Sequence, residues 1–298
     1  MMTQGPLISV GIPTYTNPTG LRRILECISG QTYTNLEIIV SDNASPGSET
    51  ELVVGEFMAT DDRIRYFRQS ENMGPMFNFV FVLQKATGEY FAWAADDDEW
   101  KNSYVENCLE RFRQNDKLAL CYSEAVIRNY RGQQEYLWPS DMVTESMRRE
   151  DGIRKILLNQ HRNTEFYGLM KTADARKYRM RGFFGEDHVF VLHLALSGEI
   201  DRTDPGLFIS GVGRTGSSNE AIVRALRLGN SQKYFGYVYQ MAFMLRLILL
   251  ENYGLRPATK ARILLSILHR FFSPQSRYSQ AIHHGIRWFF RDLVQRKL

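Results

Sequence analysis

The feature that most constrains the fold is an alternation of apolar runs and helical patterns in the first hundred residues. Apolar runs at residues 7–12, 36–40, 64–68 and 90–94 predict buried strands, and the spacing of apolar side chains between them predicts helices over 21–29, 49–58 and 77–84. Strands and helices that alternate at such short intervals form a mostly parallel sheet flanked by helices. We therefore predict an α/β, Rossmann-like fold, whose ligands bind outside the carboxyl ends of the strands.

The pattern is less regular beyond residue 100. Helical spacing recurs over 102–114, 152–159 and 186–197, and strands are expected near 118–128 and 165–170, with an irregular stretch up to about residue 150. The 298 residues suffice for one large α/β domain followed by a smaller appendage.

Charge is distributed unevenly along the chain. Residues 221–298 contain 13 basic and two acidic side chains, a net charge of +11, whereas residues 1–220 carry a net charge of −7. A basic segment attracts anionic lipid or nucleic acid. Because no recognised nucleic-acid-binding motif accompanies the charge, we expect no nucleic-acid partner.

The basic segment also has the pattern of amphipathic helices. Apolar residues share one helical face in two stretches, at positions 263, 264, 267, 268, 271 and 272 and at positions 282, 286, 289, 290, 293 and 294. Such helices suit an anionic membrane surface, and the alternative is that they pack on the rest of the chain or on a second copy, forming a homo-oligomer. Residues 238–250 are apolar but interrupted by Gln240 and Arg246, so we predict peripheral attachment without a transmembrane helix.

The cysteines and the N-terminus indicate the compartment. Three widely spaced cysteines, Cys27, Cys108 and Cys121, fit neither a disulfide framework nor a zinc site. The first residues lack the basic and hydrophobic regions of a signal peptide. We therefore expect a cytoplasmic protein, attached to the inner face of the cell membrane.

A run of acids, residues 96–99, directly follows the strand predicted over 90–94. Successive carboxylates at a strand end repel one another unless a divalent cation or a cationic ligand compensates. Mg²⁺ and Mn²⁺ bind through one or two carboxylates together with substrate phosphates. The alternative is a solvated acidic turn that caps the next helix.

Asp42 ends the second predicted strand and opens a turn. Its carboxylate either accepts hydrogen bonds from a uracil or ribose, or closes an Asx-turn with Asn43 and Ser45.

Several segments, in order, resemble the family 2 glycosyltransferases of the GT-A type. Residues 6–15 resemble that family's opening strand and nucleotide-contacting loop, 31–45 its second strand with the base-binding aspartate, and 86–98 the lead-in to its metal-binding Asp-x-Asp element. The resemblance implies a nucleotide-sugar donor, with a UDP-sugar favoured. The residues implied to bind the nucleotide are Pro13, Thr14, Tyr15, Asp42, Asn72, Asn78, Asp96 and Asp97.

One position departs from the family pattern, because Ala95 stands where the first aspartate is usual. The resemblance then implies a shifted set, in which Asp98, together with Asp97, holds Mn²⁺ or Mg²⁺. Either Asp97 or Asp96 would reach the ribose or a metal-bound water.

Residues 184–190 resemble the family's acceptor-side helix, whose Glu-Asp pair is Glu186 and Asp187 here. An acceptor hydroxyl that attacks the anomeric carbon must lose a proton, and we assign its removal to Asp187. The alternative role of this aspartate is to cap the helix. The resemblance also implies inversion, with Arg214 or the pair His161 and Arg162 as cations near the leaving diphosphate.

These features divide the chain into a catalytic GT-A domain at 1–220 and a basic helical region at 221–298. The nucleotide-sugar half is expected at about 1–100 and the acceptor half at about 101–220. The expected reaction moves a sugar from a nucleotide-diphosphate sugar to a glycan or lipid-linked acceptor, in assembly of a bacterial surface polysaccharide.

Two alternatives to this activity stay open. A nucleotide-sugar-binding protein whose transferase site has decayed is suggested by Ala95 but disfavoured by Asp97, Asp98 and Asp187. A nucleotide-sugar pyrophosphorylase would carry a Gly-rich, Arg-containing loop where this chain has residues 13–17.

Overall fold

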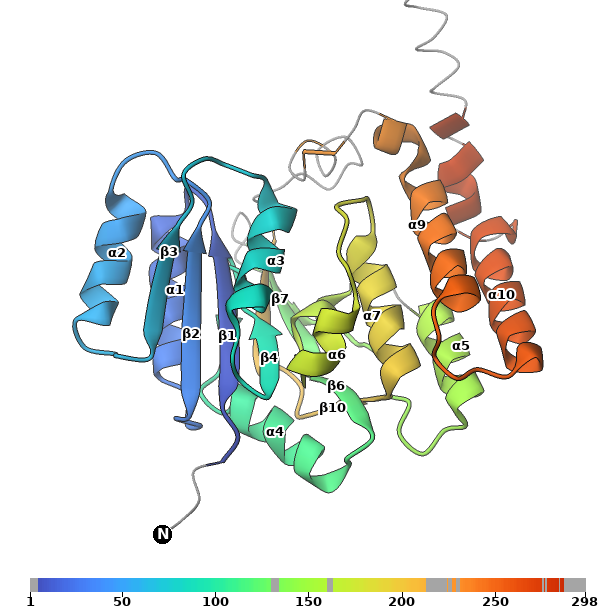
Figure 1. Ribbon diagram of the computed structural model, residues 1–298, viewed down its shortest axis with the longest axis horizontal. Helices are drawn as coiled ribbons and strands as arrows, with labels where there is room; N and C mark the ends of the chain where they lie inside the picture. The colour runs from blue at the N-terminus through green and yellow to red at the C-terminus, as the bar shows by residue number, and fades with distance from the viewer. Residues whose placement is uncertain are drawn as a thin grey trace, which may run out of the picture.

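The computed structural model describes residues 5–129, 134–159, 163–212, 224, 227–228, 231–274, 276, 278–283 and 285–286. Its central element is a seven-stranded sheet with the order β10-β6-β9-β4-β1-β2-β3 (Figure 1). The predicted α/β architecture with a mostly parallel sheet is therefore confirmed.

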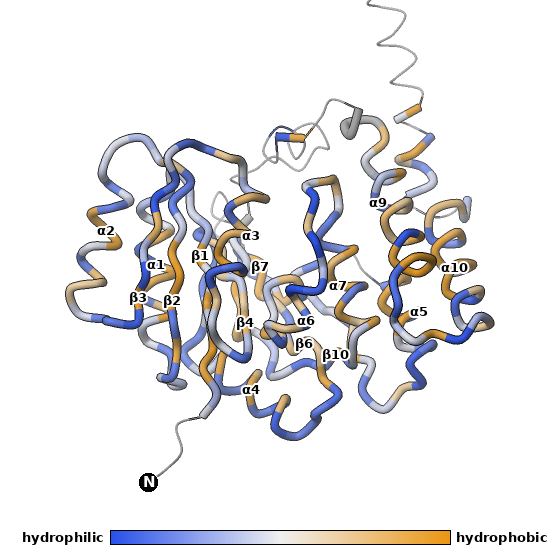
Figure 2. The backbone as a smooth tube through the Cα atoms, in the orientation of Figure 1, coloured by the Kyte–Doolittle hydropathy of each residue, from blue (hydrophilic) through white to orange (hydrophobic). Residues whose placement is uncertain are grey.

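The first half of the sheet follows the sequence pattern closely. Four parallel strands are β1 (Ile8–Thr14), β2 (Leu36–Asp42), β3 (Ile64–Arg68) and β4 (Tyr90–Trp93), and the helices between them are α1 (Pro18–Ser29), α2 (Glu49–Met58) and α3 (Pro75–Lys85). Thr14 pairs with Asp42, and Asp42 pairs with Arg68, so three strands end at the same edge. Figure 2 shows hydrophobic residues along β1 and β2, which are buried throughout.

The helices form two layers around the sheet. Alternate strand residues face opposite sides, so Ile38 and Val40 join one core while Ile39 joins the other. Helices α1, α2 and α4 (Tyr104–Gln114) cover the first face, and α3, α6 (Thr172–Lys177) and α7 (Glu186–Ser197) cover the second.

The second half of the chain departs from the predicted elements. The strand expected over 118–128 is instead two strands, β6 (Leu118–Tyr122) and β7 (Ala125–Asn129), which belong to different sheets. The strand expected over 165–170 is a 3-10 turn at Thr164–Tyr167 followed by a short antiparallel strand, β9 (Leu169–Lys171).

Several elements give no clear signal in the sequence. They are α6 and the strands β5 (Glu99–Trp100), β8 (Gln134–Leu137), β10 (Glu199–Arg202) and β11 (Phe208–Val212). A second, four-stranded sheet has the order β5-β11-β7-β8, and it places β11 beside the acidic run that follows β4.

The C-terminal helices α9 (Ser231–Leu250) and α10 (Pro257–Phe272) pack against α5 (Arg149–Asn159) and α7 (Figure 1). Ile263, Ile267 and Phe271 of α10 are fully buried in this contact. Part of the apolar face expected to meet a membrane therefore packs within the protein. Within the described residues, no helix has the length and apolar character needed to span a membrane.

Candidate active site

A cleft of about 360 Å³ opens at the carboxyl ends of β1, β2 and β4. Seven of the predicted nucleotide-binding residues line it: Pro13, Thr14, Tyr15, Asn72, Asn78, Asp96 and Asp97. The topology brings them together because parallel strands end at a common edge of the sheet. We call this the donor cleft.

Asn78, on α3, is buried and belongs to the lining of the donor cleft. Its amide nitrogen Nδ2 donates to the carbonyls of Thr14 (3.3 Å) and Ser41 (2.8 Å), which fixes the side chain. Its oxygen Oδ1 has no hydrogen-bond partner among the described residues. A ligand that donates a hydrogen bond would satisfy it.

Asp42 is fully buried beside the cleft, whereas its neighbour Asn43 lines it. The Asp42 carboxylate accepts hydrogen bonds from the Ser45 backbone N–H (2.9 Å) and the Tyr66 hydroxyl (3.2 Å). Asp42 therefore holds the turn that carries Asn43, as the Asx-turn alternative requires.

The three aspartates after β4 have different surroundings. Asp96 accepts a hydrogen bond from the Thr14 hydroxyl at 2.7 Å, and Asp97 is half-buried in the cleft wall. Asp98 is buried against β11, where its Oδ1 accepts from the Gly211 N–H at 3.1 Å. Burial raises the pKa of Asp98 well above its ordinary value, and the charges of Asp97 and Asp96 raise it further.

A second pocket, of about 480 Å³, adjoins the donor cleft and shares Pro75, Phe79 and Tyr167 with it. Its walls come from the segments around residues 163–167, 180–188 and 210 and from α9, and they include the predicted Glu186 and Asp187. We call this the acceptor pocket.

Glu186 and Asp187 begin α7 but have different roles in the structure. The Glu186 carboxylate is buried and accepts hydrogen bonds from the backbone N–H groups of Arg181 (2.6 Å) and Gly182 (2.7 Å). Glu186 therefore anchors the loop that leads into the helix, whereas 42% of the Asp187 side chain is exposed in the pocket wall.

Asp187 lies beside His188, with 3.1 Å between Oδ1 and Nδ1. Burial raises the pKa of Asp187, whereas the charge and hydrogen bonds of His188 lower it, and the net effect of all its neighbours is a lowered pKa. The Asn163 amide lies close enough to lower it further, without the geometry of a hydrogen bond. Asp187 is thus an ionised carboxylate at neutral pH, as a general base must be.

The structure adds two residues that the sequence does not identify. Tyr167 lies between the two cavities, where burial and the charges of Asp98, Asp97 and Asp187 raise its pKa and keep the hydroxyl protonated. Arg227 lines the donor cleft and donates to the carbonyl of Asn72 at 2.6 Å. Neither belongs to a motif, so only their position in space reveals them. The predicted cations His161, Arg162 and Arg214 lie outside the described residues.

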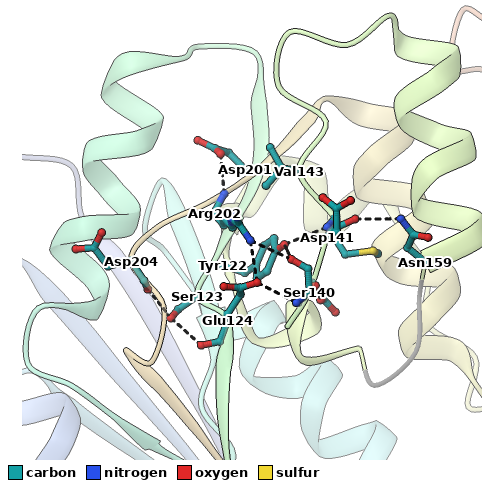
Figure 3. A network of polar contacts seen from close by, with 12 residues as sticks. Tyr122, Ser123, Glu124, Ser140, Asp141, Val143, Asn159, Asp201, Arg202 and Asp204 are labelled. Carbon is teal, nitrogen blue, oxygen red and sulfur yellow. Dashed lines mark hydrogen bonds and ion pairs between the residues drawn. The ribbon is translucent and has the colours of Figure 1, made fainter. Parts of the chain in front are cut away.

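A polar network around Glu124, Ser140 and Arg202 (Figure 3) connects to the turn that carries Tyr167. Arg202 donates to Glu124 (2.8 Å) and to the Ser140 carbonyl, and Ser140 donates its backbone N–H to Glu124 (3.0 Å). The Ser140 hydroxyl in turn donates to the buried carboxyl of Glu165, two residues before Tyr167. The network thereby ties the turn that carries Tyr167 to Glu124 and Arg202.

In the part of the chain that the structure describes, no preformed metal site accompanies these groups. Within the described residues, no three His, Cys, Asp or Glu side chains are grouped so as to hold a metal ion. Any cation at Asp97 and Asp98 would therefore need further oxygen ligands, such as those of a diphosphate.

Comparison with known proteins places this geometry in a family. Relatives include a glucosyltransferase of Campylobacter jejuni named for the acceptor GalNAc(5)-diNAcBac-PP-undecaprenol (27% identity; 60% of this chain, 62% of the relative) and the glycosyltransferase GlyG of Streptococcus pneumoniae (27% identity; 61% and 59%). The chain thus spans about three fifths of the length of these curated relatives.

Solved structures share the fold. TarS of S. aureus in complex with UDP-GlcNAc superposes with a TM-score of 0.67 (18% identity; 91% of this chain, 73% of that chain). The mannosyltransferase PcManGT of Pyrobaculum calidifontis, in complex with GDP-Man and Mn²⁺, has a TM-score of 0.60 (15% identity; 96% and 74%). Residues 9–179 match the family described as Glycosyl transferase family 2, and the chain therefore belongs to that family.

Proposed function

We propose that this protein is an inverting glycosyltransferase, which moves a sugar from a nucleoside-diphosphate sugar to a glycan or lipid-linked acceptor in bacterial surface glycan assembly. The observation that carries the proposal is the union of two cavities: a donor cleft lined by Asn78, Asp96 and Asp97, and an adjoining pocket with Asp187 in its wall. The name of the Campylobacter jejuni relative supports a lipid-linked acceptor, and the TarS complex supports a UDP-sugar.

In this proposal each cavity has a separate task. Asn78 accepts a hydrogen bond from the nucleoside through Oδ1, and Asp96, oriented by Thr14, accepts from the ribose. The ionised Asp187 takes the proton from the acceptor hydroxyl. His188, which lies beside it, stabilises the negative charge of the carboxylate. Tyr167 lies where the two cavities meet, and it donates a hydrogen bond to the part of the substrates that extends from one cavity into the other.

We also propose a divalent cation, Mn²⁺ or Mg²⁺, held by Asp98 and Asp97 together with the donor's phosphates. The buried Asp98 carboxyl, beside two other acids, suits such an ion because a cation offsets both its burial and the neighbouring charge. When bound, the ion would act as a Lewis acid for the departing diphosphate. Arg227 is placed to add positive charge at the same cleft.

Calorimetric titration of UDP, dTDP and GDP, with Mn²⁺ and then with a chelator, tests the donor site. We expect one diphosphate to bind with Mn²⁺ and to bind more weakly after chelation or in Asp98→Ala. Asp62→Ala, which removes an exposed acid far along the sequence from Asp96, Asp97 and Asp98, is the matched control. If none of the three binds under either condition, the transferase proposal fails in favour of a decayed or unrelated site.

We further propose peripheral attachment to the inner face of the membrane through α10. Beside its buried face, this helix exposes Leu265 (65%), Leu268 and Phe272 next to basic residues. Sedimentation with vesicles of phosphatidylglycerol, but not of phosphatidylcholine, should carry the protein down, and Leu265→Glu should weaken this. Equal sedimentation of wild type and variant would contradict the proposal, and a dimer in light scattering that Leu265→Glu dissociates would favour the homo-oligomer instead.

A further inference from the structure

The acceptor pocket contains a buried polar side chain that the protein leaves unsatisfied. Gln240, on α9, is 0% exposed and lines the pocket that contains Asp187. Neither its Nε2 nor its Oε1 has a hydrogen-bond partner in the described part of the chain. Buried polar groups almost always have a partner, so a side chain with two unmet groups calls for a ligand.

Gln240 is held next to the turn that presents the proposed base. A Cβ atom added to Gly185 would lie only 2.9 Å from Cδ of Gln240, so the amide packs directly on this glycine. Gly185 has a φ of +77° and immediately precedes Glu186 and Asp187. The amide therefore lies against the turn that leads into Asp187, and both residues line the acceptor pocket.

Thr164 adds a further unmet group in the same pocket. Its side chain is buried, lines the pocket, and has a hydroxyl Oγ1 without a hydrogen-bond partner among the described residues. It comes from the turn that also carries Tyr167, and so from the side of the pocket that adjoins the donor cleft.

Aromatic rings form much of the remaining wall. Phe184 meets Tyr237 edge-on at 5.1 Å, and Tyr237 meets Tyr278 edge-on at 5.2 Å, and all three rings line the pocket. A pyranose ring has apolar C–H faces, which pack on aromatic rings, and a rim of hydroxyls that need partners. A polyprenyl chain would fill the apolar space but leave the amide of Gln240 unsatisfied.

We propose that Gln240 and Thr164 form a subsite for the acceptor sugar, which recognises a pyranose with two adjacent hydroxyls. One hydroxyl donates to Oε1 of Gln240 and its neighbour accepts from Nε2, a pairing that the side-by-side amide atoms suit. This inference rests on the proposed function and deepens it, because it names the acceptor group as a sugar ring and assigns its recognition to the C-terminal helix α9.

The test uses the full chain and four simple probes: the methyl glycosides of glucose, galactose, mannose and N-acetylglucosamine. Saturation-transfer NMR should detect binding of at least one probe to the wild type. Gln240→Leu, which has a similar size but no amide, should weaken that binding about tenfold or more, because lost hydrogen bonds to a substrate hydroxyl are costly. Gln84→Leu, an exposed glutamine on α3, is the matched control and should bind like the wild type.

Thermal unfolding separates this role from a structural one. Because Gln240→Leu removes two unsatisfied polar atoms from an apolar setting, its melting temperature should equal or exceed that of the wild type. Thr164→Val, also similar in size, should weaken the same probe to a smaller degree.

Three results would overturn the inference: no probe binds the wild type, Gln240→Leu binds the probes unchanged, or Gln240→Leu unfolds at a clearly lower temperature. Titration of the preferred nucleoside diphosphate distinguishes this failure from failure of the proposed function. A wild type and a Gln240→Leu variant that bind the diphosphate equally leave the transferase proposal intact whatever the glycosides show.

Discussion

The donor cleft and the acceptor pocket differ in how their polar groups are satisfied. In the donor cleft, Thr14 donates to Asp96, and Asn43 donates to Asn72 at 3.0 Å. Among the described residues that line it, the one buried polar side-chain atom without a partner is Oδ1 of Asn78. In the acceptor pocket, Gln240 and Thr164 are buried without partners in the described structure. We infer that the donor site is organised before its ligand binds, whereas the polar groups of the acceptor site gain hydrogen-bond partners when the ligand binds.

The largest expected effect is on the rate of sugar transfer, in a variant that changes the acceptor pocket but leaves the donor cleft intact. Asp187→Asn removes the ionised carboxylate but keeps its shape, so sugar transfer should fall about 10²- to 10⁴-fold, the range for loss of a general base. Binding of the nucleoside diphosphate should be unchanged, because Asp187 is among the described residues that line the acceptor pocket and not among those that line the donor cleft. Product formation and calorimetry on the same preparation measure the two quantities.

Asp62→Asn is the control for this substitution, since it makes the same chemical change on an exposed side chain. Transfer that survives in Asp187→Asn at the level of this control would remove Asp187 from the chemistry. Loss of diphosphate binding would show instead that the two cavities do not act separately.

A smaller effect is expected from the donor side. Thr14→Val removes the hydroxyl that donates to Asp96, and a hydrogen bond to a charged group contributes about 1.5–3 kcal/mol. We expect diphosphate affinity to fall about tenfold or more, while the methyl glycosides bind as before. Thr60→Val, on an exposed threonine after α2, controls for the loss of a hydroxyl. Equal affinity in Thr14→Val would mean that Asp96 needs no orientation.

The contrast between the two cavities also explains which parts of the structure could be predicted. The bounds of α2, β3 and α7 agree with the prediction because signals in neighbouring residues define each element. The helices α2 and α7 begin with an acidic first turn, and β3 is a short apolar run followed by a turn. The donor residues follow from the same local pattern, since parallel strand ends share one edge of the sheet.

The acceptor pocket depends on contacts that local patterns do not contain. The strand expected over 118–128 is broken at Ser123, whose hydroxyl donates to the carbonyl of Asp204 (2.7 Å), a residue 81 positions away. In the sequence, Gln240 is only a polar interruption of an apolar segment. Its position against Gly185 arises from the packing of α9 on α7, which no local spacing encodes.

Glu186→Gln tests whether the loop before α7 holds Asp187 in its position in the acceptor pocket. The carboxylate accepts from Arg181 and Gly182, and the amide can replace only one of these bonds well. We expect a loss of about 1–3 kcal/mol in the free energy of unfolding, and a several-fold fall in transfer through a displaced Asp187. Urea titration and product formation measure these effects. Unchanged stability with a transfer defect as large as that of Asp187→Asn would instead give Glu186 a catalytic role.

The smallest expected effect is on the free energy of unfolding and concerns Glu165, in the turn that carries Tyr167. Burial raises the pKa of Glu165, although the Ser140 hydroxyl lowers it in part. When a carboxyl has a higher pKa in the folded than in the unfolded protein, its contribution to stability is fully present below the unfolded pKa. That contribution is lost as the pH rises through the folded pKa. Glu165→Gln resembles the protonated form, so it should match the wild type near pH 4 and be more stable near pH 8, by on the order of 1 kcal/mol. Urea unfolding at both pH values measures this, and a difference that does not change with pH would mean that Glu165 is held by its hydrogen bond rather than by its charge state.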